Sequence, residues 1–129
     1  MPTTDVIRET IWEDAAIQCL ARVTGLAGAA ITQTSLSSIT YKIFDLNGAT
    51  PNTPISSGTL TIASVVFDAL QTDARWTLDT TGYNFRHAHV PTAFPIGDHT
   101  YRIEYVFTPT NGDAFPGVFE VYAKAVRGG

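Results

Sequence analysis

The chain of 129 residues has little cysteine, little charge and no long hydrophobic run. Its single cysteine excludes an internal disulfide, and a domain of this length removes roughly two thirds of its unfolded surface from water without one. Only 16% of the residues are charged, and a net charge of −4 with eight scattered Lys and Arg residues argues against nucleic acid as a partner. Because every hydrophobic stretch ends within about eight residues, we expect no membrane-spanning segment.

The first residues also lack a secretory signal. No basic region followed by an apolar region occurs at the N-terminus. We therefore expect synthesis in a cytoplasm, with no signal peptide.

The chain is instead rich in β-branched residues: 19 Thr, ten Ile and nine Val. These side chains suit pleated sheets, and apolar residues recur with a period of two along most of the chain. The segment 59–67 is apolar on both faces near its end, which predicts either a strand covered on both sides or two short strands joined by a bulge. The expected strands cover residues 16–24, 38–45, 59–67, 76–78, 83–90, 100–108 and 115–126.

About seven strands separated by turns, with no convincing helix after residue 15, predict an all-β antiparallel sandwich. Parallel α/β folds need crossover helices, which the pattern lacks. We expect one domain over residues 15–129, preceded by an arm over residues 1–14.

The arm differs in composition from the rest of the chain, with four acids, one base and a cluster of apolar residues. Ile7 and Ile11 are spaced for one helical turn, with Trp12 beside them, so an arm or a short helix is expected. Two interpretations stay open. The segment is a loosely docked terminus, or it packs on a neighbouring subunit through Trp12.

Three histidines form the only metal-like grouping. His87 and His89 are two apart on an expected strand and so share a face, and His99 follows ten residues later. The simpler interpretation is a solvent-facing strand end beside Pro91. No paired carboxylate completes a ligand set nearby, and we expect no metal site and no cofactor.

The sequence also argues against an enzyme. It has no Gly-x-Ser-x-Gly nucleophile elbow, and Cys19 falls on the apolar face of its strand, where we expect a small buried side chain rather than a reactive thiolate. The Asp45-x-Asn47-Gly48 run could offer oxygens to calcium, but an Asx turn explains it with less strain on the pattern.

Aromatic side chains offer a non-catalytic role. A row of exposed rings would form a platform for sugars, with Trp12, Trp76, Tyr83, Tyr105 and Tyr122 as candidates. Core packing competes for the same residues. We expect Trp76, Tyr101 and Tyr105 in the core, and Trp12 and Tyr122 as surface anchors.

The segment from Ile96 to Phe107 resembles one corner of an immunoglobulin-like sandwich. Tyr101 stands three residues after Asp98, just inside a long strand, as does the tyrosine whose hydroxyl bonds upstream backbone in that fold. The Cys…Trp…Cys framework of antibody domains is missing, which excludes an antibody domain.

Together with the runs 38–48 and 67–85, this corner resembles the small immunoglobulin-like proteins encoded among the structural genes of tailed bacteriophages and prophages. The N-terminal domain of the baseplate upper protein is the nearest named type, and the resemblance covers about residues 15–126. It carries no catalytic or binding residue across.

The resemblance implies a virion or tail component made in a bacterial cytoplasm. Such a subunit is non-enzymatic and works through contacts with copies of itself and with other phage structural proteins. The interface residues expected from the sequence are Ile7, Ile11, Trp12 and Tyr122. The alternative is a module that binds glycans or a host cell surface.

Overall fold

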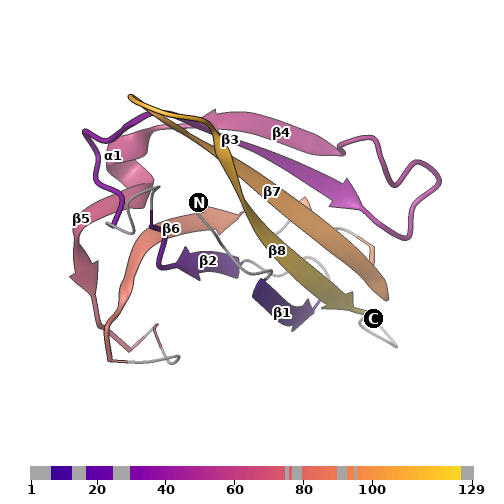
Figure 1. Cartoon of the computed structure of the whole chain (residues 1–129). Helices are drawn as coiled ribbons and strands as arrows, with labels where there is room; N and C mark the ends of the chain where they lie inside the picture. Colours follow the sequence, from indigo (N-terminus) through magenta and orange to yellow (C-terminus); the bar gives the residue numbers. More distant parts are fainter. Residues whose placement is uncertain are drawn as a thin grey trace.

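Two β-sheets face each other as the two layers of a sandwich (Figure 1). The structure, a computed structural model, describes residues 7–12, 17–24, 30–74, 76, 80–89, 93–94 and 96–125, and only the main chain of residues 7–12. In these residues the elements are β1 (Ile7–Trp12), β2 (Ile17–Ala21), β3 (Leu36–Asp45), β4 (Ser56–Leu60), α1 (Ile62–Val65), β5 (Val66–Gln71), β6 (Tyr83–His89), β7 (His99–Pro109) and β8 (Phe115–Lys124).

The strand order confirms the predicted all-β sandwich. One sheet runs β1-β8-β7-β3-β4 and the other β2-β6-β5. In immunoglobulin-like sandwiches, strands B, E and D lie in one sheet and C, F and G in the other, and β2, β6, β5 and β3, β7, β8 take these places in the same chain order. The pairings among β2 to β8 are antiparallel, as expected.

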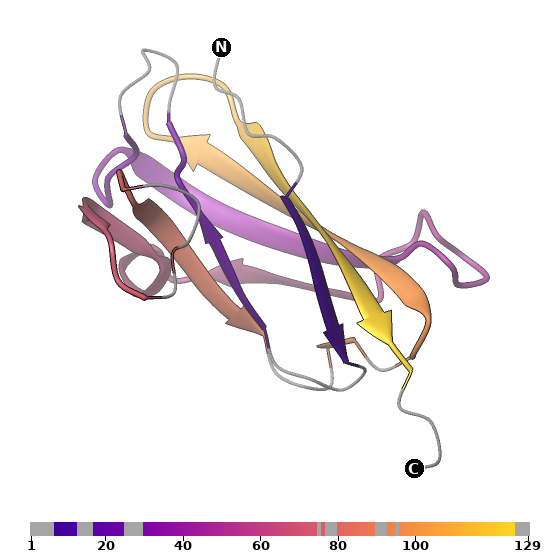
Figure 2. The ribbon, with the colours of Figure 1, turned by 90° about the horizontal axis from the view of Figure 1, so that it is seen from below.

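The expected arm or short helix is a strand over part of its length. β1 pairs in parallel with β8 and extends the five-stranded sheet, and Figure 2 shows the two strands side by side. Ile7 stands opposite Phe119 and Trp12 opposite Lys124. A helical turn over Ile7–Trp12 is therefore wrong, because the main chain there bonds to a neighbouring strand instead of to itself.

The expected strand 59–67 is also divided. β4 ends at Leu60, α1 makes a single turn, and β5 begins at Val66 in the other sheet. The turn carries the chain from one layer to the other, which a bulge within one strand would not do. Among the described residues, no helix is long and apolar enough to cross a membrane.

The short strand expected around Trp76 and Leu78 lies mostly outside the described residues. Trp76 itself is in no strand and is half-buried against Tyr83, with ring centroids 5.7 Å apart. The prediction that Trp76 belongs to the core is thus only partly met, whereas Tyr101 and Tyr105 are fully buried as expected.

Alternating side chains of both sheets fill the interior. Phe85 of β6 meets Tyr105 and Phe107 of β7, with centroids 4.9 and 5.3 Å apart in edge-to-face geometry. Cys19 on β2 is 1% exposed, as predicted for a small buried side chain. Burial of these period-two faces supplies most of the driving force for folding.

Tyr101 makes the corner hydrogen bonds predicted from the sequence. Its hydroxyl accepts from the amide of Ile96 at 2.8 Å and donates to the carbonyl of the same residue at 3.2 Å. The loop before β7 is thereby fixed to the start of that strand. Asp98, inside this loop, has a positive φ of 61°, a conformation that Asp tolerates better than most residues.

Asp45 closes the β3 end with an Asx turn, also as predicted. Its Oδ1 accepts a hydrogen bond from the amide of Asn47 at 3.0 Å. The Asn47 side chain in turn accepts from the amide of Thr100 at 2.6 Å, so the turn is tied to β7.

Candidate functional site

The solvent side of the five-stranded sheet carries an ordered set of side chains. Inward residues of β3, β7 and β8 alternate with outward ones, and the outward set contains both charged and apolar members. We use the term outer face for the seven residues Lys42, Phe44, Arg102, Glu104, Val106, Glu120 and Tyr122.

Charges of opposite sign are neighbours on this outer face. Lys42 stands opposite Glu104 across β3 and β7, and Arg102 stands opposite Glu120 across β7 and β8. Arg102 joins the two pairs: its Nε lies 2.7 Å from Glu104 Oε2 and its Nη1 lies 3.7 Å from Glu120 Oε2.

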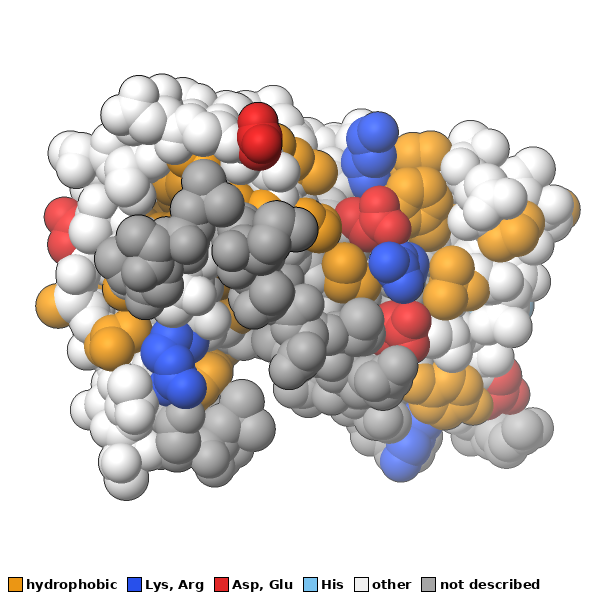
Figure 3. Space-filling view, in the orientation of Figure 1, with side chains coloured by type: hydrophobic (Ala, Val, Ile, Leu, Met, Phe, Trp, Pro, Cys, Tyr) orange, Lys and Arg blue, Asp and Glu red, His pale blue; other side chains and the backbone are white. Residues whose placement is uncertain are grey.

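The result is a charged row Lys42, Glu104, Arg102, Glu120, with signs that alternate from one end to the other. Figure 3 shows basic and acidic side chains alternating over β3, β7 and β8, with hydrophobic side chains beside them. Exposed ion pairs contribute only about 0–1 kcal/mol each to stability. Their energetic effect is larger where a partner excludes water from them.

Apolar side chains flank the charged row. Val106 is 39% exposed and stands opposite Pro116, and Tyr122 is 37% exposed and stands opposite Thr100. The Tyr122 hydroxyl donates a hydrogen bond to Asp98 Oδ1 at 3.0 Å, which fixes the ring on the surface.

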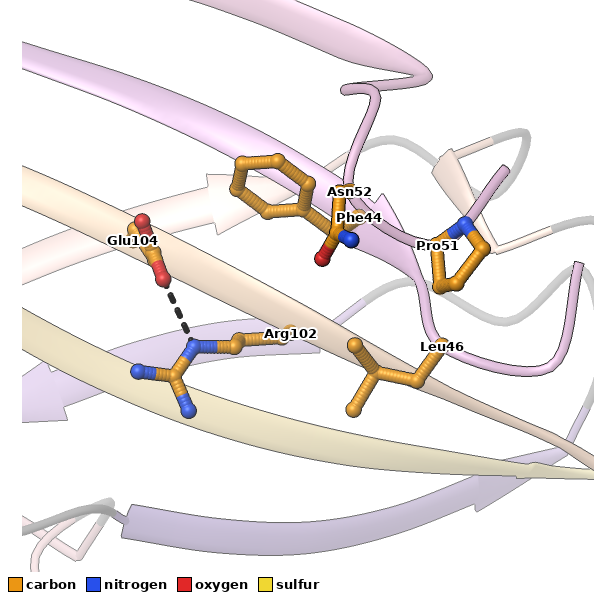
Figure 4. Close-up of a pocket in the computed structure, with 6 residues that line it drawn as sticks. All are labelled: Phe44, Leu46, Pro51, Asn52, Arg102 and Glu104. Carbon is orange, nitrogen blue, oxygen red and sulfur yellow. Dashed lines mark hydrogen bonds and ion pairs between the residues drawn. The ribbon is translucent and has the colours of Figure 1, made fainter.

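A shallow pocket of about 310 Å³ opens at one end of the outer face (Figure 4). Phe44, Arg102 and Glu104 come from the strands, and Leu46, Pro51 and Asn52 come from the loop between β3 and β4. The pocket thus combines one aromatic ring with an amide and an ion pair, a set of groups that can stack on and hydrogen-bond to a polar ligand.

Of the interface residues expected from the sequence, Tyr122 is exposed on the outer face. The side chains of Ile7, Ile11 and Trp12 lie outside what the structure describes. Among the proposed sugar-stacking aromatics, Tyr83 and Tyr105 are fully buried and cannot contact a ligand at the surface. A platform built from those two rings is therefore excluded.

His87 and His89 share one face of β6, as predicted, but that face is the interior. His87 Nδ1 and His89 Nε2 each lie 2.8 Å from the hydroxyl oxygen of Tyr105. A neutral phenol has one proton, so it donates to one ring and accepts an N–H from the other. The interpretation of a solvent-facing strand end is wrong for His89, which is 7% exposed.

Burial sets the protonation of this cluster. Desolvation lowers the pKa of His87, and desolvation together with the neighbouring His87 lowers the pKa of His89 to about 3. Desolvation also raises the pKa of Tyr105 well above its usual range. All three groups are neutral near pH 7, which suits the low-dielectric interior.

His99 lies apart from the other two histidines. Its Nδ1 is 2.8 Å from both carboxylate oxygens of Asp45, whereas His87 and His89 surround Tyr105. In the part of the chain that the structure describes, no three His, Cys, Asp or Glu side chains come together as metal ligands. Every buried side-chain nitrogen or oxygen in the same part has a hydrogen-bond partner.

Sequence reasoning missed the two central features of these sites. The position of Tyr105 between both histidines was not foreseen, although Phe85, His87 and His89 alternate on one strand and Phe85 is apolar. The charged row was missed because it depends on which residues of β3, β7 and β8 stand opposite one another. That register is set by the sheet and is not visible in any one segment.

Comparison of the chain with protein-family models, curated proteins and solved structures gives no match.

Proposed function

We propose that this protein is a non-enzymatic structural or adhesion subunit of a phage or phage-derived particle, and that it self-associates through the outer face. The observation that carries the proposal is the outer face itself, where exposed Val106 and Tyr122 flank an ordered row of four charges. Tyr and Arg are enriched where proteins contact one another, and apolar side chains beside them supply the burial.

A non-enzymatic role is supported by how the polar interior is used. Asp45, Asn84 and His89 are the buried polar side chains of the described residues, and each is hydrogen-bonded within the domain. Those bonds hold turns and strands together. The groups that a reaction would need are thus engaged in holding the fold.

The phage part of the proposal rests on the resemblance of residues 15–126 to immunoglobulin-like proteins of tailed-phage structural genes. Other structural proteins of the same particle are the further partners. Mass spectrometry of gradient-purified particles from the organism that encodes the chain tests this part. We expect the chain in the particle fraction, and its recovery only in the particle-free fraction would contradict a virion role.

Self-association is tested by sedimentation velocity on the full chain and on a matched pair of variants. Val106→Arg places a charge on the outer face, while Leu70→Arg places one on β5 of the opposite sheet at nearly equal exposure, 38%. We expect wild type and Leu70→Arg to gain mass with concentration and Val106→Arg to stay monomeric. A wild-type chain that remains monomeric up to about 100 μM would overturn the proposal.

A second candidate function is glycan binding, which the pocket beside Phe44 favours. Sugar rings stack on aromatic faces, and Asn52, Arg102 and Glu104 offer hydrogen-bond donors and acceptors at the same place. A glycan array with wild type, Phe44→Ala and the Leu70→Arg control tests it. Binding that Phe44→Ala abolishes and Leu70→Arg retains would favour this function, and an array without binding would exclude it for the glycans present.

A further inference from the structure

We propose that the outer face binds a second copy of this chain about a two-fold axis that lies in the plane of the face and at right angles to the charged row. In this arrangement Lys42 of each copy faces Glu120 of the other, and Arg102 faces Glu104. The inference rests on the proposed function and adds to it the identity of one partner and its orientation.

The order of the charges carries the argument. Along the row the signs are plus, minus, plus and minus, from Lys42 on β3 through Glu104 and Arg102 on β7 to Glu120 on β8. A row of four alternating charges changes every sign when it is read from the other end. It is therefore complementary to a reversed copy of itself.

A two-fold axis at right angles to the row performs this reversal. It places each end of one row against the opposite end of the partner's row, so that four unlike contacts form together. An axis along the row would instead place Lys42 on Lys42 and Glu120 on Glu120. Because like charges in contact cost several kcal/mol at an interface, the row selects the first orientation.

The apolar side chains beside the row supply burial in the same contact. Val106 and Tyr122 lie near opposite ends of β7 on the outer face, Val106 opposite Pro116 and Tyr122 opposite Thr100. The charges then act as they do in many interfaces: they fix the orientation and exclude wrong pairings, while apolar contact provides affinity.

A charge-swap experiment tests the orientation. Lys42→Glu and Glu120→Lys each create two like-charge contacts in the two-fold pair, so each variant alone should associate at least about 10-fold more weakly than wild type. An equimolar mixture of the two variants should recover association, because the acid introduced at position 42 of one chain then faces the base introduced at position 120 of the other. The double variant should recover association on its own.

Controls separate this inference from simpler effects. Asp113→Lys, at an exposed position between β7 and β8, changes the net charge by the same amount as Glu120→Lys and should associate like wild type. Thermal unfolding of each single variant checks that it is folded. For a variant that does not fold, Lys42→Gln and Glu120→Gln replace the reversals, with a smaller loss expected and no recovery on mixing.

The outcomes are distinguishable from failure of the proposed function. If wild type self-associates but the mixture and the double variant stay as weak as the single variants, the orientation is wrong and the proposed function stands. If wild type does not self-associate, both are wrong. Recovery in the mixture together with the double variant is the result that only the two-fold arrangement explains.

Discussion

The hydroxyl of Tyr105 on β7 lies 2.8 Å from Nε2 of His89 on β6, so a hydrogen bond joins the two sheets through the interior. Desolvation lowers the pKa of His89 to about 3 in the folded protein, whereas an unfolded histidine titrates near 6.5. Between these values the unfolded chain binds the extra proton and the folded chain does not. Stability is therefore complete above pH 6.5 and falls as the pH drops toward 3.

We expect the free energy of unfolding to fall by roughly 4 kcal/mol from this residue between about pH 7 and pH 3. His89→Gln keeps a hydrogen-bonding group but cannot titrate, so its unfolding free energy should depend less on pH over the same range. Urea denaturation at several pH values measures the difference. Parallel pH curves for wild type and His89→Gln would contradict a neutral buried imidazole.

Removal of the Tyr101 hydroxyl should destabilise the fold. Tyr101→Phe leaves the amide and the carbonyl of Ile96 without the bonds that close the loop before β7, at a cost of about 1–3 kcal/mol. Tyr122→Phe is the matched control, since it removes one exposed hydrogen bond to Asp98 and should cost less than about 0.5 kcal/mol. Equal losses in chemical denaturation would show that the corner bonds contribute nothing special.

Asn84 should tolerate no charge. Its side chain accepts a hydrogen bond from the amide of Val23 at 2.8 Å and donates one to the carbonyl of the same residue at 2.9 Å, both buried. Asn84→Asp sets a carboxylate against that carbonyl, and we expect a loss of about 3 kcal/mol or more at pH 7. The loss should shrink in acid as the new carboxyl group takes up a proton, which denaturation at about pH 7 and pH 4 would show.

The single thiol makes a reporter of opening. Because Cys19 is 1% exposed between the sheets, a thiol reagent should modify native protein far more slowly than denatured protein. The modification rate should rise in Asn84→Asp, since that variant opens more often. A native rate close to the denatured rate would contradict the buried position of Cys19.

The strands of the core could be predicted because their side chains alternate without interruption. Residues 100–108 and 115–126 place aromatic and β-branched residues on every second position, and β7 and β8 cover nearly the same ranges. The Tyr101 corner was equally local, since donor and acceptors lie within six residues of one another. Short-range patterns of this kind are readable from one segment.

The rest depends on contacts between distant segments. Nothing within 59–67 indicates that the chain must cross from one sheet to the other, which is why α1 was not foreseen. The parallel pairing of β1 with β8 joins residues more than 100 positions apart. The charged row needs the register of three strands at once, and so the candidate site was not predictable even where its strands were.

The pairing of β1 with β8 has a consequence for the behaviour of a shortened chain. β8 is ten residues long, and without β1 one side of it would present a row of unpaired amides and carbonyls, the kind of edge that recruits strands from other molecules into fibrous aggregates. β1 covers part of that edge with six residues that include Arg8 and Glu9. With β1 in place the sheet stays finite, so that assembly proceeds through side chains and not through open-ended sheet growth.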